Sequence, residues 1–384
     1  MKRFSLTAAA LLTAAMVASG AASAADPGVK PQEIVIGAFL PLQSGLAAGA
    51  TQVRDGADAY FKHINEQGGV HGRKITWLTE NDSYNPQQAV AVVRKLVDRD
   101  GIFAIVSTLG TSTALAVLPY LNQRGIPAIN LIGGDEKLNA PKDKNVFGLL
   151  PTGEVNGQAL AEYAVNQAKG KKIGIFFQND KFGTDIRDGA REVLKEKGIK
   201  PTEVSYVPSD VSMASQVVSL REAGVDTVIM ACITKHGALF LQEAQKLGWK
   251  PNFVAMNTMG DPITADLAGS ALEGVVVNLF VAVDTMDNPQ VKQANQILAK
   301  YYPNTKPGYW SYMGMAGAMA FVEAAKRAGP DLTRAKLIAA LESMNGYNPG
   351  VVPPLPWSPK NHGSSNSIGF AVWKGGKLEV LKGW

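Results

Sequence analysis

The stretch that decides the fold is AIVSTLGTSTALAVLPYLNQ, residues 104–123. An apolar run that suits a buried strand leads into the turn Thr108-Leu109-Gly110-Thr111-Ser112-Thr113, and a helical pattern follows. Strand, short turn and helix form the repeating unit of α/β proteins. The hydroxyl-rich turn has three interpretations: caps for the helix, a site that holds an anion or another ligand, or a nucleophilic serine.

Strand-like and helical segments alternate on both sides of this turn. Before the stretch NVFGLLPTG (145–153), the strand-like runs are residues 33–40, 74–80, 102–107 and 126–132. After that stretch the alternation restarts, with strand-like runs at 171–178, 202–207, 226–232 and 252–257. Two successive series of this kind predict two parallel sheets, each covered by helices on both faces.

The last hundred residues change the pattern. Helical segments are expected at about 288–301, 309–328 and 333–342, and a hairpin of residues 368–374 and 377–384 closes the chain around Gly375-Gly376. A helical block after the second α/β series indicates that the chain returns to its first domain. Several crossings between two domains would form a hinge.

The N-terminus predicts export. Lys2 and Arg3 precede the apolar run LTAAALLTAAMVA, and Ala22-Ser23-Ala24 forms a small-x-small cleavage motif. This arrangement is typical of a secretory signal peptide, here residues 1–24. No later run of about 18 apolar residues is present, so the protein is not expected to span a membrane.

Composition excludes several classes of protein. Without Lys2 and Arg3 the chain has 36 basic against 33 acidic residues, and it has no block of Lys and Arg that would suit a nucleic acid. Cys232 is the only cysteine, so no internal disulfide can form. With 46% hydrophobic residues the chain can bury the cores of two domains.

Signatures of catalysis are few. The chain has no phosphate-binding G-x-x-x-x-G-K-[ST] loop, no G-x-G-x-x-G after a strand and no H-E-x-x-H, so neither a cofactor nor a metal is expected. Ser112 in GTSTA resembles a nucleophile elbow only loosely, because the second glycine of that motif is Ala114 here. A secreted serine hydrolase, with His236 or His362 as its base, stays an alternative.

Capture of an anion explains the turn at 108–113 in another way. The first turn of a helix offers free N–H groups and the positive end of the helix dipole, and the hydroxyls add further donors. In open α/β sheets, ligands lie outside the carboxyl ends of the strands. Gly133-Gly134 follows the next strand and is expected beside the same site, although an ordinary turn explains the pair equally well.

Several segments together resemble one known family. They are IVIGAFLPLQSG, GADAYFKHINEQGGVHGRKITW, DSYNPQQAVAVVRKLV, GIPAINL, NDKFGTD and AGVDTVIMA. In this order they resemble the periplasmic leucine/isoleucine/valine-binding family, which are type I solute-binding proteins of ABC importers. The resemblance implies a periplasmic protein, expected as a monomer, that delivers a small molecule to membrane permease subunits.

The resemblance also implies a fold. It is the type I periplasmic-binding-protein fold, with two doubly wound α/β lobes joined by three hinge crossovers. The break points place these crossovers near 150, 275–285 and 355–360. The first lobe is then residues 26–150 plus 280–357, and the second lobe is 151–279 plus 358–384.

The same resemblance assigns a site. In branched-chain amino-acid binders a hydroxyl residue after the third strand holds the ligand carboxylate, and Thr111 matches it. Their glutamate that pairs with the ligand ammonium matches Asn257, a threonine after the fourth strand matches Gly134, and a tyrosine matches Phe182. The predicted binding residues are Leu109, Thr111, Ser112, Thr113, Gly133, Gly134, Phe182, Asn257 and Tyr309.

An ammonium buried without a carboxylate partner is costly, so an α-amino acid fits this site poorly unless Asp261 or Asp284 supplies the charge. Small residues in SGLAAGAT (44–51) are expected to widen the first-lobe wall. Phe182 and the group Tyr309, Trp310 and Tyr312 supply flat surfaces, or else belong to the interlobe core. The expected ligand is a small carboxylate without an amine, in its sharpest form an aromatic acid such as a benzoate or phenylpropanoid. The alternatives are an amino acid or small amide, and a sensory ligand-binding module.

Overall fold

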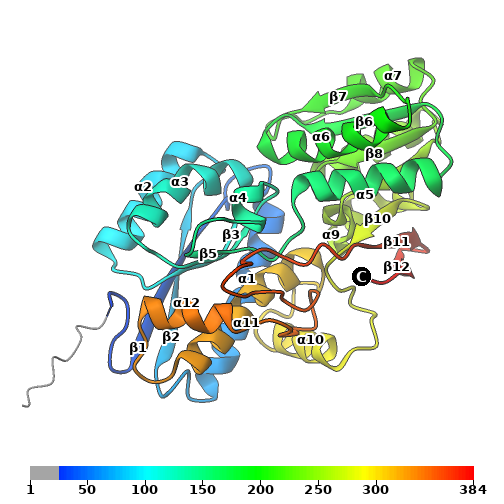
Figure 1. Cartoon of the computed structure of the whole chain (residues 1–384). Coiled ribbons are helices and arrows are strands. Elements are labelled where there is room, and N and C mark those ends of the chain that lie inside the picture. The colour runs from blue at the N-terminus through cyan, green and yellow to red at the C-terminus, as the bar shows by residue number, and fades with distance from the viewer. Residues whose placement is uncertain (1–25) are drawn as a thin grey trace, which may run out of the picture.

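The computed structural model describes residues 26–384, so the predicted signal peptide lies outside the described residues. Figure 1 shows two β-sheets flanked by helices, side by side. The first sheet is entirely parallel, in the order β2-β1-β3-β4-β5. Its strands are β1 (Glu33–Leu40), β2 (Lys74–Asn81), β3 (Ile105–Leu109), β4 (Ala128–Ile132) and β5 (Val146–Phe147).

The second sheet has the order β12-β11-β10-β9-β8-β6-β7. Five neighbouring strands run parallel: β7, β6, β8, β9 and β10. Strands β11 and β12 add an antiparallel edge. The pair Lys374 and Lys377 closes the predicted hairpin. The strands are β6 (Ile173–Gln178), β7 (Thr202–Tyr206), β8 (Thr227–Ala231), β9 (Asn252–Ala255), β10 (Val276–Leu279), β11 (Gly369–Lys374) and β12 (Lys377–Lys382).

Alternating side chains bury both faces of the first sheet. On β1, Ile34 and Ile36 join the core beneath α1 and α11, whereas Val35 and Phe39 join the core beneath α2 and α3. The late helices lie on the first sheet, where α11 packs against α1, β3 and β4. The helices of this first lobe are α1 (Ala47–Glu66), α2 (Pro86–Arg94), α3 (Thr111–Gln123), α4 (Glu136–Asn139), α10 (Pro289–Tyr301), α11 (Tyr309–Ala328) and α12 (Arg334–Glu342).

The second lobe repeats this arrangement around the second sheet, and it contains one long helix that the sequence does not predict. This helix, α5, packs against α6 and begins at Thr152, whose hydroxyl accepts a hydrogen bond from Val155 N at 3.3 Å. A Cβ on Gly157 would lie 1.9 Å from Ile186 O, so this glycine lets the two helices approach closely. The helices are α5 (Gly153–Asn166), α6 (Lys181–Glu196), α7 (Ala214–Glu222), α8 (Thr234–Lys246) and α9 (Pro262–Ala268).

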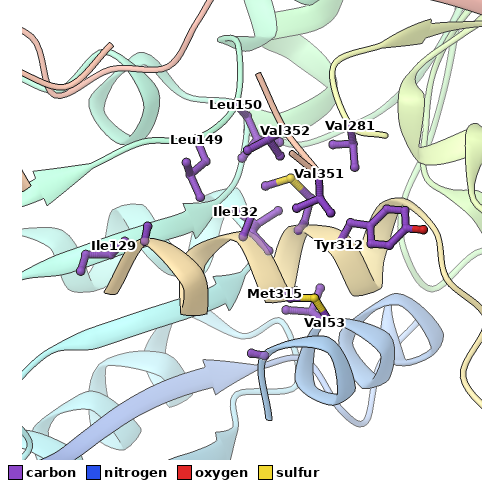
Figure 2. Packing of buried hydrophobic residues seen from close by; sticks show 14 of the residues in the cluster. Val53, Ile129, Ile132, Leu149, Leu150, Val281, Tyr312, Met315, Val351 and Val352 are labelled. Carbon is purple, nitrogen blue, oxygen red and sulfur yellow. The ribbon is translucent and has the colours of Figure 1, made fainter. Parts of the chain in front are cut away.

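Helix α11 is the centre of the first-lobe core. A Cβ on Gly56 of α1 would lie 1.9 Å from Ser311 O, and one on Gly314 of α11 would lie 2.0 Å from Val53 O, so the backbones of the two helices nearly touch. Figure 2 shows Met315 of α11 beside Val53 of α1, with Tyr312 near the start of α11. Among residues 26–384, no helix is both long and apolar enough to cross a membrane.

Three connections between the sheets lie side by side over α11. Figure 2 places Leu150, Val281 and Val351, one from each connection, in a single cluster. Ala282 N donates a hydrogen bond to Val351 O at 2.9 Å. We propose that these connections form the hinge, with the lobe boundaries near 150, 280 and 357 that the sequence predicts.

Candidate ligand-binding site

A cavity lies between the lobes, outside the carboxyl ends of strands from both sheets. Leu109 and Ile132 end β3 and β4 on one side, while Gln178 ends β6 and Phe280 follows β10 on the other. Its empty volume, which includes the solvent-filled space at its mouth, is about 520 Å³. Six of the predicted binding residues line this cavity: Leu109, Thr111, Gly133, Gly134, Phe182 and Tyr309.

Helix α3 begins at this cavity with no side-chain cap. Its N-cap residue is Gly110, at φ 132°, where a Cβ would lie 2.4 Å from Thr113 Oγ1 and 2.9 Å from the Tyr84 ring. The N–H groups of residues 111–113 have no acceptor within residues 26–384. The capping interpretation of the hydroxyls is therefore wrong, and the helix presents free donors and its positive dipole end to the cavity.

The three hydroxyls of this turn differ in their roles. Thr111 is 2% exposed, and its Oγ1 accepts a hydrogen bond from Gly134 N at 3.0 Å, so its own proton is left to donate. Thr113 Oγ1 instead donates to Gly110 O at 3.2 Å, inside the turn. Neither Ser112 nor Thr113 lines the cavity, so of the three hydroxyl residues only Thr111 contacts it directly.

The two glycines after β4 also differ. A Cβ on Gly133 would lie 2.9 Å from Leu138 Cδ1 and 3.0 Å from Thr111 Cα, so the close approach of β4 to α3 requires glycine there. A Cβ on Gly134 would have no neighbour nearer than 3.6 Å, at Gly153 Cα. The absence of a side chain at Gly134 therefore leaves space in the cavity, as the sequence predicts.

Aromatic rings form much of the remaining wall. Phe182, Phe280, Tyr309 and Trp310 all line the cavity, and the Tyr309 and Trp310 rings meet edge to face at 4.7 Å between centroids. Burial raises the pKa of the Tyr309 hydroxyl, so this phenol stays neutral. Tyr312 does not belong to the wall: its hydroxyl is within hydrogen-bond distance of Asn295 Oδ1, and the side chain packs in the first-lobe core (Figure 2).

The small residues of the first loop serve a different purpose from the one expected. A Cβ on Gly49 would lie 2.8 Å from Trp310 Cε2, so this glycine makes room for the indole and not for a ligand. Leu46, from the same loop, does line the cavity.

No Asp, Glu, Lys, Arg or His side chain lines the cavity among the residues described. Asn257 lies in the 3₁₀ turn Asn257–Gly260, and its neighbours Met256 and Thr258 form the wall while Asn257 does not. The Asn257 side chain is buried, and its Oδ1 has no hydrogen-bond partner within residues 26–384. The structure therefore does not place Asn257 where it would contact a ligand.

Neither of the two aspartates considered as sources of charge faces the cavity. Asp261 caps α9 through Ile263 N at 3.0 Å and accepts a second hydrogen bond from Trp310 N at 3.1 Å, which ties α9 to α11. Burial raises the pKa of Asp261 to about 6. Asp284 lines a separate surface cavity beside Lys306.

Four polar residues of the wall were missed from the sequence: Tyr84, Asn156, Gln178 and Thr258. Tyr84 follows β2, and its hydroxyl crosses the cleft to donate to Asp180 Oδ2 at 2.6 Å; Gln178 Nε2 donates to the same oxygen at 2.6 Å. Burial, reinforced by Asp180, raises the pKa of Tyr84 well above its usual value, so the hydroxyl keeps its proton. Trp310 Nε1 also crosses between the lobes, to Thr234 Oγ1 at 3.3 Å. These two bonds, from Tyr84 and Trp310, connect the two sides of the cavity directly.

The hydrolase alternative finds no support in the geometry. His236 stacks on Tyr206, neither of its ring nitrogens has a hydrogen-bond partner within residues 26–384, and burial lowers its pKa to about 4. His362 stacks on Phe147 and bonds to Glu342 at 3.1 Å. Neither histidine is positioned to activate Ser112. In the same residue range, no group of His, Cys, Asp and Glu side chains could hold a metal ion.

Known proteins are similar to this chain in sequence and in fold. The profile of the family described as periplasmic binding protein matches residues 33–377. The chain is 26% identical to the Leu/Ile/Val-binding protein homolog 3 of Brucella melitensis, across 91% of this chain and 94% of that one.

Solved structures give the same result for the fold. A fatty acid ABC transporter substrate-binding protein from Thermomonospora curvata superimposes with a TM-score of 0.85 at 22% identity, covering 93% of each chain. A solute-binding protein of an ABC transporter from R. palustris, in complex with benzoate, has a TM-score of 0.82 at 19% identity and covers 91% of this chain and 96% of its own. The expected fold is confirmed, and the chain belongs to the periplasmic binding protein family as a type I member related to the branched-chain amino-acid-binding proteins.

Proposed function

We propose that this protein is the exported binding component of an ABC importer and that it captures a small acid without an α-amine. The carboxylate lies at the start of α3, where Thr111 Oγ1 and the free N–H groups of residues 111–113 donate to it. The apolar body of the ligand contacts Phe182 and Tyr309. The observation that carries this proposal is a wall with free donors and no charged side chain.

The same wall argues against an amino acid. An ammonium buried here would lose its hydration and gain no carboxylate partner. Carboxylates outside the wall bond to wall residues. Asp180 Oδ2 already accepts from Tyr84 and Gln178 while its Oδ1 caps α6, and Asp82 Oδ1 accepts from Tyr84 N at 2.9 Å. The similar structures include a fatty acid ABC transporter protein and a benzoate complex as well as a valine complex, so acids without an amine are within the range of this fold.

Export and partners complete the proposal. Residues 1–24 have the composition of a cleaved signal peptide, and the family is periplasmic. The protein then acts as a monomer that passes its ligand to membrane permease subunits. It needs no catalytic group for this, and it returns the ligand chemically unchanged.

The test compares ligands that differ in one group. 3-Phenylpropanoate and phenylalanine share the same body and carboxylate, and they differ only in the amine; benzamide tests a neutral amide. We expect benzoate and 3-phenylpropanoate to raise the unfolding temperature and phenylalanine and leucine to leave it unchanged. A ligand at a hundred times its Kd stabilises the folded state by about 2.7 kcal/mol. Binding of phenylalanine without binding of 3-phenylpropanoate would refute the proposal in favour of an amino-acid binder.

A pair of variants then tests the carboxylate position. A hydrogen bond to a charged group contributes roughly 1.5–3 kcal/mol, so Thr111→Val should weaken the binding of 3-phenylpropanoate about ten- to a hundredfold in calorimetry. Thr111→Ser keeps the hydroxyl and should retain most of the affinity. The neighbouring change Ser112→Ala removes a hydroxyl that does not line the cavity, and it should weaken binding far less than Thr111→Val.

A further inference from the structure

A second cavity adjoins the ligand-binding cavity between the lobes. Its empty volume is about 330 Å³, and it is lined by the start of α1 on the first lobe and by α8 and α9 on the second. Ala48 and Gly49 form one side, and Ile263 and Leu267 form the other. Leu267 is 43% exposed, so this cavity reaches the molecular surface.

Three residues line both cavities and therefore stand between them: Leu46, Ile233 and Trp310. Trp310 is held in place, because its Nε1 bonds to Thr234 Oγ1 at 3.3 Å and Gly49 lies against its ring. Leu46 and Ile233 are aliphatic side chains with no such bond, so they are the part of this partition that is free to change rotamer.

The wall of the second cavity is mainly apolar. Lys235 is its one charged residue, is only half-buried, and has no carboxylate within 4 Å among residues 26–384. A lysine in this position can add its aliphatic stem to the wall and keep its ammonium in water. Such a cavity suits a hydrocarbon chain better than a polar group.

We propose that the second cavity is a subsite for the distal part of the same ligand, so that the natural ligand is an elongated acid. Its carboxylate lies at the start of α3, and its alkyl or arylalkyl chain passes between Leu46 and Ile233 toward Leu267. This inference rests on the proposed function, and it narrows the substrate class from any small acid to acids that are longer than the first cavity. An amino acid or a single-ring acid would leave the second cavity unused.

Calorimetry with butanoate, hexanoate, octanoate and decanoate tests the subsite. Each buried methylene strengthens binding about fourfold, so the affinity of the wild type should keep rising to decanoate. Ala48→Phe places a ring in the second cavity from an exposed position that does not line the first. This variant should bind decanoate at least tenfold more weakly and butanoate as the wild type does. Ala47→Phe is the matched control, because Ala47 lines only a neighbouring surface cavity, whereas Ala48 lines both that cavity and the second one.

The outcomes separate the two proposals. An affinity that stops rising at hexanoate, which is no longer than 3-phenylpropanoate, or an Ala48→Phe variant that binds decanoate as tightly as the wild type, would overturn the subsite while leaving the proposed acid binder intact. Equal weakening of butanoate and decanoate by Ala48→Phe would also overturn it. Failure of every acid to bind the wild type would refute the proposed function, and the subsite with it.

Discussion

The bond between Tyr84 and Asp180 can be removed with little other change. Tyr84 Oη donates to Asp180 Oδ2 at 2.6 Å, from the first lobe to the second. In Tyr84→Phe the carboxylate keeps its hydrogen bonds from Gln178 Nε2 and from the N–H groups of Phe182 and Gly183. The substitution therefore removes one interlobe bond and leaves no buried charge without a partner.

The size of the effect follows from the chemistry of the bond. A hydrogen bond to a charged acceptor contributes roughly 1.5–3 kcal/mol, so the ratio of closed to open protein should fall by about ten- to a hundredfold. Because the ligand-binding form is the closed one, the apparent affinity falls with the closed fraction. We expect 3-phenylpropanoate to bind Tyr84→Phe up to a hundredfold more weakly than the wild type.

Calorimetry measures this affinity, and small-angle scattering measures closure through the radius of gyration of the loaded protein. Tyr312→Phe is the matched control, because it removes the same atom from a contact with Asn295 inside the first lobe. This control should lower the unfolding temperature and leave affinity and closure unchanged. If Tyr84→Phe matched the wild type in both affinity and radius of gyration, the reasoning about the interlobe bond would be refuted.

Two further changes test the cavity and its surroundings. Gly134→Val adds a side chain where a Cβ fits, so ligand affinity should fall at least tenfold in calorimetry with the unfolding temperature unchanged; wild-type affinity would contradict the cavity assignment. Burial raises the pKa of Asp82 from 3.8 to about 6, so the folded protein holds more protons than the unfolded chain between these values and stability falls as pH rises through this window. Asp82→Asn should remove this loss of stability. In urea denaturation the variant should be more stable than the wild type by up to about 3 kcal/mol at pH 8, but not at pH 3. Equal stability of the two proteins at pH 8 would contradict the prediction.

Local signals in the sequence account for most of the fold. Asn85-Pro86 predicts the start of α2, and Asn85 Oδ1 does accept from Gln88 N at 2.9 Å. Gly68 and Gly69, at φ 101° and 80°, adopt left-handed conformations that end helix α1. Helix α5 escapes prediction because its glycines weaken the helical pattern. They are present because α5 and α6 lie in close contact, and no local pattern shows such a contact.

The sequence indicates those wall residues that follow a single strand, and it does not indicate those whose position depends on contact between the two lobes. Thr111 and Gly134 follow neighbouring parallel strands, so both must lie at one edge of the sheet. The family resemblance gives Asn257 a position in the chain, but it does not show where its side chain points. Successive side chains in a 3₁₀ turn point about 120° apart, and here the neighbours Met256 and Thr258 face the cavity. Tyr84 acquires its role only when the second lobe brings Asp180 to it.

Because the cavity wall carries no charged side chain among the residues described, the free energy of closing the lobes depends on the ligand. In the open protein, water satisfies the free N–H groups at the start of α3. Closing the lobes without an acid removes that water, and each unsatisfied buried donor then costs about 1–3 kcal/mol. A bound carboxylate satisfies these donors and complements the helix dipole, so the closed form is stabilised by the acid itself. A buried arginine at the same place would bind the acid more strongly. Its positive charge, however, would also need a compensating anion in the open form. A helix N-terminus holds the acid firmly only while the cleft is shut, which suits a protein that must release its ligand once the lobes separate.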